Sequence, residues 1–171
     1  MNSQGGFTLG ELLLTLAITS VLLVGAVPGF VTLQRENRLT AVTNELITAL
    51  YLARSEAVKR GTRVTFCAST DGEHCAVDGL GYQRGWIVFT DPNDSGDLDA
   101  GEVALAVSQA RVVTIKGNAL VQRYVSYVAT GAARTTSGAL QMGTLTLCSP
   151  PSGREVTINV GGRVRVSRID C

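Results

Sequence analysis

The sequence GGFTLGELLLTLAI, residues 5–18, places a single carboxylate, Glu11, inside an apolar run. From Phe7 to Phe30 there are 24 residues, and Glu11 is the only ionisable side chain among them. At ~1.5 Å per residue, a helix of this length spans the ~30 Å hydrocarbon core of a bilayer. An ionisable group in such a helix is energetically expensive and usually has a functional partner. We therefore expect Glu11 to have a partner.

The composition indicates one globular domain after this run. The chain has 171 residues, of which 45% are hydrophobic and 17% are charged. About 140 residues remain beyond the apolar run, which is enough for a domain with its own core. The formal net charge is +1, so binding to nucleic acid or acidic lipid would have to come from a local patch. No Lys or Arg precedes Phe7, so the run is not an ordinary secretory signal.

A single helix of over fifty residues is predicted from the apolar run to Gly61, which follows two basic residues as helix ends often do. Pro28 should weaken or kink it, because proline lacks a backbone donor. In the second half, apolar residues recur at three- and four-residue steps, which predicts an amphipathic helix packed on a domain. The stripe consists of Leu39, Val42, Leu46, Ala49, Leu50, Ala53 and Ala57.

Short β runs follow Gly61, with turn residues between them and no long amphipathic helix. The predicted strands cover residues 64–67, 85–89, 103–107, 112–115, 123–128, 145–148, 154–160 and 163–169. The fold class is therefore α+β, with a long N-terminal helix packed on an antiparallel β-sheet domain. In the last hairpin the valines and Ile158 occupy even positions, so only an odd-length loop pairs apolar with apolar. That register leaves Arg163 and Arg165 on the solvent face.

The four cysteines, Cys67, Cys75, Cys148 and Cys171, indicate two disulfides formed in an oxidising compartment. Four cysteines permit three connectivities. We favour Cys67–Cys75, which closes a glycine-containing loop, and Cys148–Cys171, which ties down the C-terminus. A zinc site that uses Cys67, His74 and Cys75 is the alternative, although it lacks a usual ligand spacing. No catalytic constellation is found, and we predict that the protein is not an enzyme.

The opening stretch resembles the class III signal of type IV prepilins and type II secretion pseudopilins. This resemblance implies that prepilin peptidase cuts after Gly6 and methylates the new N-terminus at Phe7. It puts Glu11 and Pro28 at two hallmark pilin positions. Gly10 departs from the pattern, because an aliphatic residue usually precedes the glutamate.

The remainder resembles the minor pilins of the FimT, FimU and GspH group. The residues that carry this resemblance are ARSEAVKRG, GWIVFTDPNDSGDLDAGE and the terminal GGRVRVSRIDC. It implies a leader at 1–6, an apolar transmembrane or pilus-core helix at 7–33, an amphipathic helix at 34–61 and a β-rich periplasmic domain at 62–171. The implied location is the inner membrane, as a single-pass protein, and then the cell surface in the pilus.

The resemblance also implies what the protein contacts and does. Its expected partners are other minor and major pilins, prepilin peptidase and the inner membrane, and its expected work is assembly of the pilus tip or priming complex. A FimT-type role in DNA uptake and a GspH-type pseudopilin role in secretion are the alternatives. In a pilus, the ammonium at Phe7 of a neighbouring subunit is the expected partner of Glu11, and breaking one side of such a buried pair costs roughly 3–5 kcal/mol.

The segment from Asp91 to Glu102 fits the spacing of a calcium-binding loop. Its candidate ligands are Asp91, Asn93, Ser95, Asp97, Asp99 and Glu102. A solvated turn stabilised by Asp and Asn side chains is the alternative, because the segment follows a strand rather than a helix and Pro92 restrains its entry. No cofactor other than calcium is suggested.

The C-terminal hairpin carries a concentration of basic residues, Arg163, Arg165, Arg168 and the nearby Arg154. The GGRVR segment resembles the G-R-x-R signature linked to DNA binding in FimT-type pilins. Guanidinium groups on a strand face suit contacts with the phosphates of double-stranded DNA, which give affinity without reading the sequence. The alternative is a solvated strand face, paired with Asp170 and the terminal carboxylate.

Overall fold

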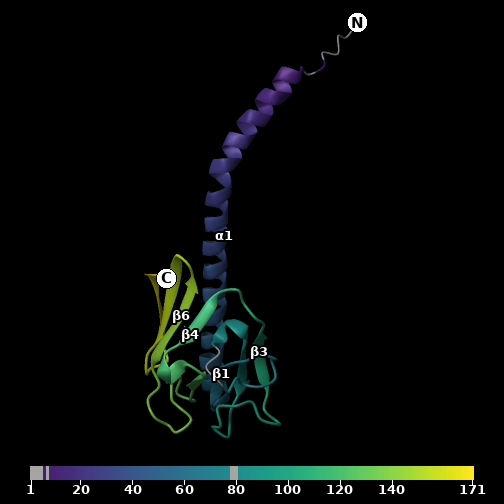
Figure 1. Ribbon diagram of the computed structural model, residues 1–171. Coiled ribbons are helices and arrows are strands. Elements are labelled where there is room, and N and C mark those ends of the chain that lie inside the picture. The colour runs from purple at the N-terminus through teal and green to yellow at the C-terminus, as the bar shows by residue number, and fades with distance from the viewer. Residues whose placement is uncertain (1–5, 7, 78–80) are drawn as a thin grey trace. The chain divides into compact units, whose positions relative to one another are not determined.

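The structure is a computed structural model that describes residue 6 and residues 8–77 and 81–171, without the side chains of residues 23–28 (Figure 1). The chain divides into two compact units, Met1–Asn37 and Arg38–Cys171. The predicted boundary between the apolar and amphipathic parts of the helix was at residue 33. Helix α1, Leu9–Arg60, contributes to both units and is 52 residues long, as the sequence predicts.

The first unit consists mainly of the apolar part of α1. Its large side chains are exposed: Leu9, Leu12, Leu13, Leu14, Leu16, Ile18, Val21, Leu22, Phe30, Val31 and Leu33. Among the described residues, no helical segment has both the length and the hydropathy needed to cross a membrane. The predicted span at 7–33 includes Phe7 and the side chain of Pro28, which both lie outside the described residues.

The second unit is built around the amphipathic part of α1. All seven residues of the predicted apolar stripe are buried, from Leu39 to Ala57. They share one hydrophobic cluster with inward-facing side chains of both sheets, among them Phe66, Leu147 and Ile158. Trp86 belongs to this cluster and is 2% exposed.

All eight predicted strands form, with ends shifted by a few residues. They are β1 (Val64–Ala68), β2 (Trp86–Thr90), β3 (Ala104–Ser108), β4 (Thr114–Gly117), β5 (Tyr124–Tyr127), β6 (Gly143–Ser149), β7 (Ser152–Ile158) and β8 (Val164–Asp170). Two short 3₁₀ helices cover Tyr82–Arg84 and Ala119–Val121. All pairings are antiparallel, as predicted, but the strands make two sheets, ordered β3-β2-β1-β5 and β4-β6-β7-β8.

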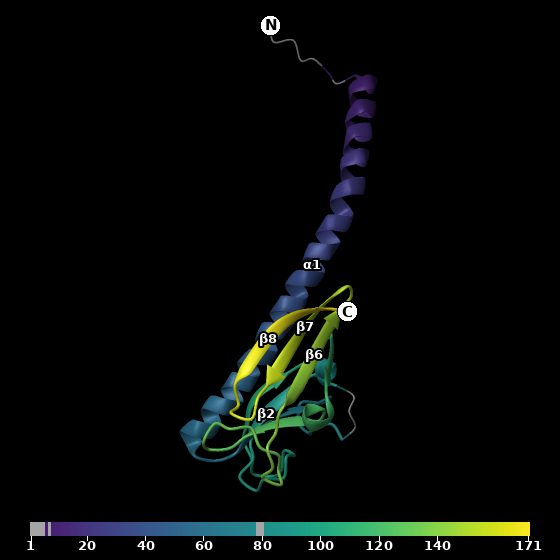
Figure 2. The same cartoon turned by 90° about the vertical axis from the view of Figure 1, so that its left-hand side faces the viewer.

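The two sheets differ in how their outer faces are covered. Every residue of β1 and β2 is buried, because a second small cluster of Cys67, Cys75, Ile87 and Phe89 packs on the outer face. Strand β8, by contrast, lies at an edge of its sheet and is largely exposed. Figure 2 shows β6, β7 and β8 side by side. The β8 edge of this second sheet is therefore accessible to solvent.

The β7–β8 hairpin has the odd loop that the sequence predicts. Ile158 pairs with Val164, and Val156 pairs with Val166. The amide of Asn159 donates to the carbonyl of Arg163 at 3.1 Å, and the amide of Gly162 donates to the carbonyl of Asn159 at 2.9 Å. Gly162 has φ 73°, a left-handed conformation that glycine adopts without strain.

Candidate functional site

Glu11 caps the first turn of its own helix. One of its carboxylate oxygens, Oε2, accepts hydrogen bonds from the Thr8 amide at 2.9 Å and from Thr8 Oγ1 at 3.1 Å. In return, Thr8 Oγ1 accepts the Glu11 amide at 3.3 Å. This is a capping box, and its T-x-x-E signature at residues 8–11 is a sequence signal that could have predicted it. Gly6 is exposed, whereas Phe7 lies outside the described residues.

The loop after β2 is organised by Asp91, whose side chain is completely buried. Its carboxylate accepts hydrogen bonds from Thr65 Oγ1 on β1 at 2.7 Å, from the Ser95 amide at 2.9 Å and from the Gly96 amide at 3.1 Å. The carboxylate therefore folds the loop back onto the sheet. Three donors from the protein thus share this carboxylate.

The other carboxylates of this loop also bind protein groups. Asp97 pairs with Arg123, and Asp94 pairs with Arg63. Asp99 accepts hydrogen bonds from Asn93 Nδ2 at 2.9 Å and Ser95 Oγ at 2.8 Å, and these bonds lower the pKa of Asp99. Desolvation raises the pKa of Glu102, whose Oε2 accepts the Asp99 amide at 3.0 Å.

These contacts bear on the calcium expectation. Nowhere in the described residues, which include the whole of 91–102, do three or more His, Cys, Asp or Glu side chains gather as they would around a metal ion. The six expected ligands, Asp91, Asn93, Ser95, Asp97, Asp99 and Glu102, instead bond to one another or to neighbouring protein groups. Such bonds are those of the stabilised turn, the alternative to a calcium site, and calcium binding stays a prediction.

Arg63 is a structural residue that the sequence analysis missed. It is 7% exposed, and its Nη1 donates to Ser126 Oγ at 2.9 Å and to the carbonyls of Arg134 and Thr135, both at 3.1 Å. Through Asp94 it also holds the acidic loop. No local pattern marks this role, because its partners come from three distant segments.

The disulfides have the pairing that the sequence analysis favours. Cys67 bonds to Cys75, and Cys148 bonds to Cys171. The Cys67–Cys75 disulfide includes both cysteines that the alternative zinc site would need as ligands. His74, the third ligand of that alternative, is exposed, and its Nδ1 lies 2.9 Å from Asp71 Oδ2.

The basic hairpin residues do not share one face. Side chains alternate between the two faces of a strand. Arg163 and Arg165 therefore lie on the outer face, while Arg154 and Arg168, which are paired across β7 and β8, lie on the same face as Val156 and Val166. Arg163, Arg165 and Arg168 are exposed, and none of their side chains forms an ion pair with a described residue. The predicted cluster of four is thus reduced to Arg163 and Arg165.

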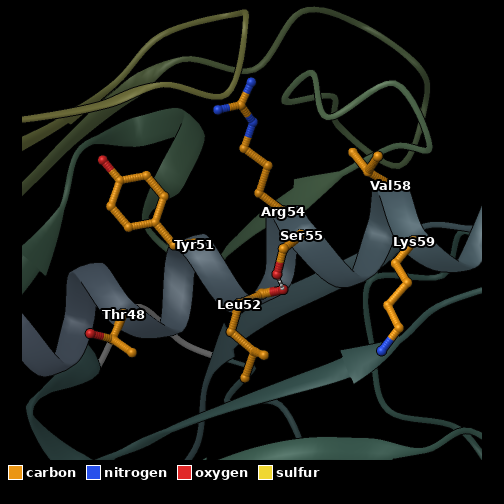
Figure 3. Close-up of a pocket in the computed structure, with 7 residues that line it drawn as sticks. All are labelled: Thr48, Tyr51, Leu52, Arg54, Ser55, Val58 and Lys59. Carbon is orange, nitrogen blue, oxygen red and sulfur yellow. Dashed lines mark hydrogen bonds between the residues drawn. The ribbon is translucent and has the colours of Figure 1, made fainter.

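A groove of about 690 Å³ lies along the exposed side of α1 (Figure 3). Its lining residues are Thr48, Tyr51, Leu52, Arg54, Ser55, Val58 and Lys59. Arg54 extends from the helix toward neighbouring loops (Figure 3). Its guanidinium donates to the carbonyls of Gly131 and Gly161, so the side chain is held by two loops.

Comparisons with known proteins agree with this architecture. A family model described as type II transport protein GspH matches residues 42–162, and a model of the prokaryotic N-terminal methylation motif matches residues 1–27. No curated protein matches the chain.

Two crystal structures of the type IV minor pilin FimU from Pseudomonas aeruginosa share its fold. One has a TM-score of 0.56 at 22% identity and covers 75% of this chain and 92% of its own. The other has a TM-score of 0.57 at 21% identity and covers 77% and 90%. Because the GspH model spans more than half of the sequence, the chain belongs to the GspH family and is a minor pilin or pseudopilin of a type IV pilus or type II secretion system.

Proposed function

We propose that this chain is a minor pilin of a type IV pilus, inserted in the inner membrane and then built into the pilus tip or priming complex. The observation that carries the proposal is the series of exposed apolar side chains on the first part of α1, from Leu9 to Leu33. Burying one such side chain is worth about 1.5–3 kcal/mol, so the segment gains stability among the helices of other pilins. A pilin subunit of this kind works by assembly and not by catalysis.

In this proposal, Glu11 determines the register in which the apolar helices of neighbouring subunits pack. Both hydrogen bonds from Thr8 end on Oε2, and Oε1 accepts none from the described residues. Oε1 therefore remains available for the ammonium of a processed neighbour that begins at Phe7. Packing registers that leave the carboxylate unpaired are penalised, because a buried charge without a partner is strongly destabilising.

A deletion strain separates the pilus role from the secretion role. Loss of surface pili and twitching motility, with secretion of folded proteins intact, is the expected result. Loss of secretion with normal twitching would contradict the proposal and favour a GspH-type pseudopilin. Complementation with the intact gene must restore the lost function.

A second candidate function is contact with double-stranded DNA through the outer face of the basic hairpin. It is supported by the exposure of Arg163 and Arg165 and by their lack of an acidic partner among the described residues. They are two positions apart on one face, which is about 7 Å along a strand. Lys116 on β4 is exposed on the same outer face, as the registers of β4, β6 and β7 show.

A binding titration at several salt concentrations tests this second function. Few phosphate contacts predict weak binding, with a Kd of about 10⁻⁴–10⁻⁶ M at physiological salt. Replacing Arg163 and Arg165 by Gln should weaken binding to every duplex alike and flatten the salt dependence by about one unit of slope per lost contact. Arg168→Gln is the matched control on the other face. Equal binding by the wild type and the double variant would exclude this function.

A further inference from the structure

Arg54 joins two segments that lie far away from it in the sequence. Its Nε donates to the carbonyl of Gly131 at 2.9 Å, and its Nη2 donates to the carbonyl of Gly161 at 3.1 Å. Gly161 is in the turn of the β7–β8 hairpin, directly before Gly162 and Arg163. Figure 3 shows the Arg54 side chain leaving α1 in the direction of these loops.

The backbone of the hairpin turn packs closely on the same contact. A Cβ on Gly162 would come within 2.1 Å of the Gly131 carbonyl oxygen, 3.0 Å of Tyr127 Cε1 and 3.2 Å of Arg54 Nε. The amide of Ala133 donates to the carbonyl of Val160 at 3.1 Å, so the neighbouring loop holds the turn as well. The turn is therefore anchored to the body of the domain, and Arg54 is the side chain that ties it to the helix.

We propose that Arg54 is a positioning residue for the basic hairpin: it fixes the turn at 160–162 and thereby the direction in which Arg163 leaves the strand. The functional consequence rests on the second function proposed above, contact with DNA. This role connects two stretches of the sequence, ARSEAVKRG on the helix and GGRVR in the hairpin, through one guanidinium group.

The chemistry of the contact requires arginine. Its planar fork directs separate N–H groups at the two carbonyls, whereas lysine has one flexible ammonium on an unforked stem. The two donors are already engaged by Gly131 and Gly161. In this proposal Arg54 acts on DNA through the hairpin.

Amide hydrogen exchange on the full chain in detergent micelles tests the anchoring. In Arg54→Lys and Arg54→Met, the amides of Gly162 and Ala133 should exchange about tenfold faster, because the hydrogen bonds of Arg54 to Gly131 and Gly161 are weakened or lost. Arg60→Lys and Arg60→Met are the matched controls, because Arg60 is on the same helix and pairs only locally with Glu56. Unchanged exchange in the Arg54 variants would overturn the proposal. Arg54→Lys keeps the charge, so it serves if Arg54→Met fails to fold.

A double-mutant cycle tests the functional part. Arg54→Lys should weaken binding of duplex DNA about threefold in the wild-type background and have no effect in the Arg163→Gln background. An equal loss in both backgrounds would show that Arg54 acts independently of Arg163, and would contradict the proposal. If the wild type binds no DNA, the second proposed function fails, while faster exchange at Gly162 still supports the anchoring role.

Discussion

The sulfur of Cys171 lies where a side chain on Gly153 would be. A Cβ built on Gly153 would come within 2.3 Å of Cys171 Sγ and 2.9 Å of Ile169 Cγ1. Gly153 is paired with Cys148 on β6, the partner of Cys171 in the disulfide. The C-terminal disulfide therefore requires a residue without a side chain at position 153, and this glycine is a packing requirement rather than a turn signal.

Gly153→Ala should therefore interfere with the Cys148–Cys171 bond. We expect free thiols in the purified protein and a lower thermal midpoint, because either the bond or the strand must move. Gly161→Ala is the control, since a Cβ there meets only Asn159 Oδ1, at 3.4 Å. A fully oxidised Gly153→Ala variant with an unchanged midpoint would contradict this account.

Asp91→Ala should destabilise the domain to the same extent with and without calcium. The change removes the acceptor of the Gly96 amide and one of the two acceptors of both the Ser95 amide and the Thr65 hydroxyl, at a cost of about 1–3 kcal/mol. Asp170→Ala, at an exposed position on β8, is the control and should have little effect. Thermal melts in chelator and in millimolar calcium provide the comparison. A loss of stability seen only with calcium would restore the metal-binding interpretation.

The contact between Glu45 and Arg111 should give the domain an acid-sensitive component. Hydrogen bonds from Arg111 lower the pKa of Glu45 below its ordinary value of 4.5, and Ser108 Oγ adds another at 2.8 Å. A lowered carboxylate pKa stabilises the fold above the unfolded value and ceases to do so as the pH falls through the folded value.

Glu45→Gln should therefore reduce the free energy of unfolding most near neutral pH. The difference from the wild type should shrink as the pH falls below about 4.5. Denaturant titrations at several pH values measure this difference, and Arg111→Met should give the same profile. A difference that grows toward low pH would be the wrong sign for this mechanism.

Processing at Gly6 gives a prediction that depends only on the methylation motif, which matches residues 1–27. Mature protein should begin at methylated Phe7, as intact-mass measurement can establish. Gly6→Val should accumulate as the uncleaved form, because a β-branched side chain replaces the glycine at the cut. Retention of Met1 in assembled protein would refute the assignment of the leader.

The periodic parts of the fold could be predicted because the apolar positions in the sequence are the positions that are buried in the structure. The stripe from Leu39 to Ala57 is buried as its spacing indicates, and the parity of the last hairpin gave the correct register. The same alternation of even and odd positions puts Arg154 and Arg168 on the opposite face of the hairpin from Arg163. The sequence therefore already argued against a single cluster of four arginines.

Periodicity could not decide whether the acidic loop binds calcium. A calcium loop and a turn held by Asp and Asn side chains use the same residue types at the same spacing. The contacts that favour the turn come from outside the loop: Thr65 on β1 and the two arginines that pair with the loop, Arg63 and Arg123. The contact of Arg54 with Gly131 and Gly161 is equally long-range, and no local signature marks it.

The central claim is that Glu11 directs assembly, and the amount of this subunit in sheared pili tests it most directly. Glu11→Val should insert in the membrane at least as well as the wild type, because it removes a charge from an apolar helix. Its incorporation into pili should nevertheless fall sharply, whereas Glu73→Gln, at an exposed position of the domain, should be incorporated normally. Normal amounts of the Glu11→Val subunit in sheared pili would contradict the account.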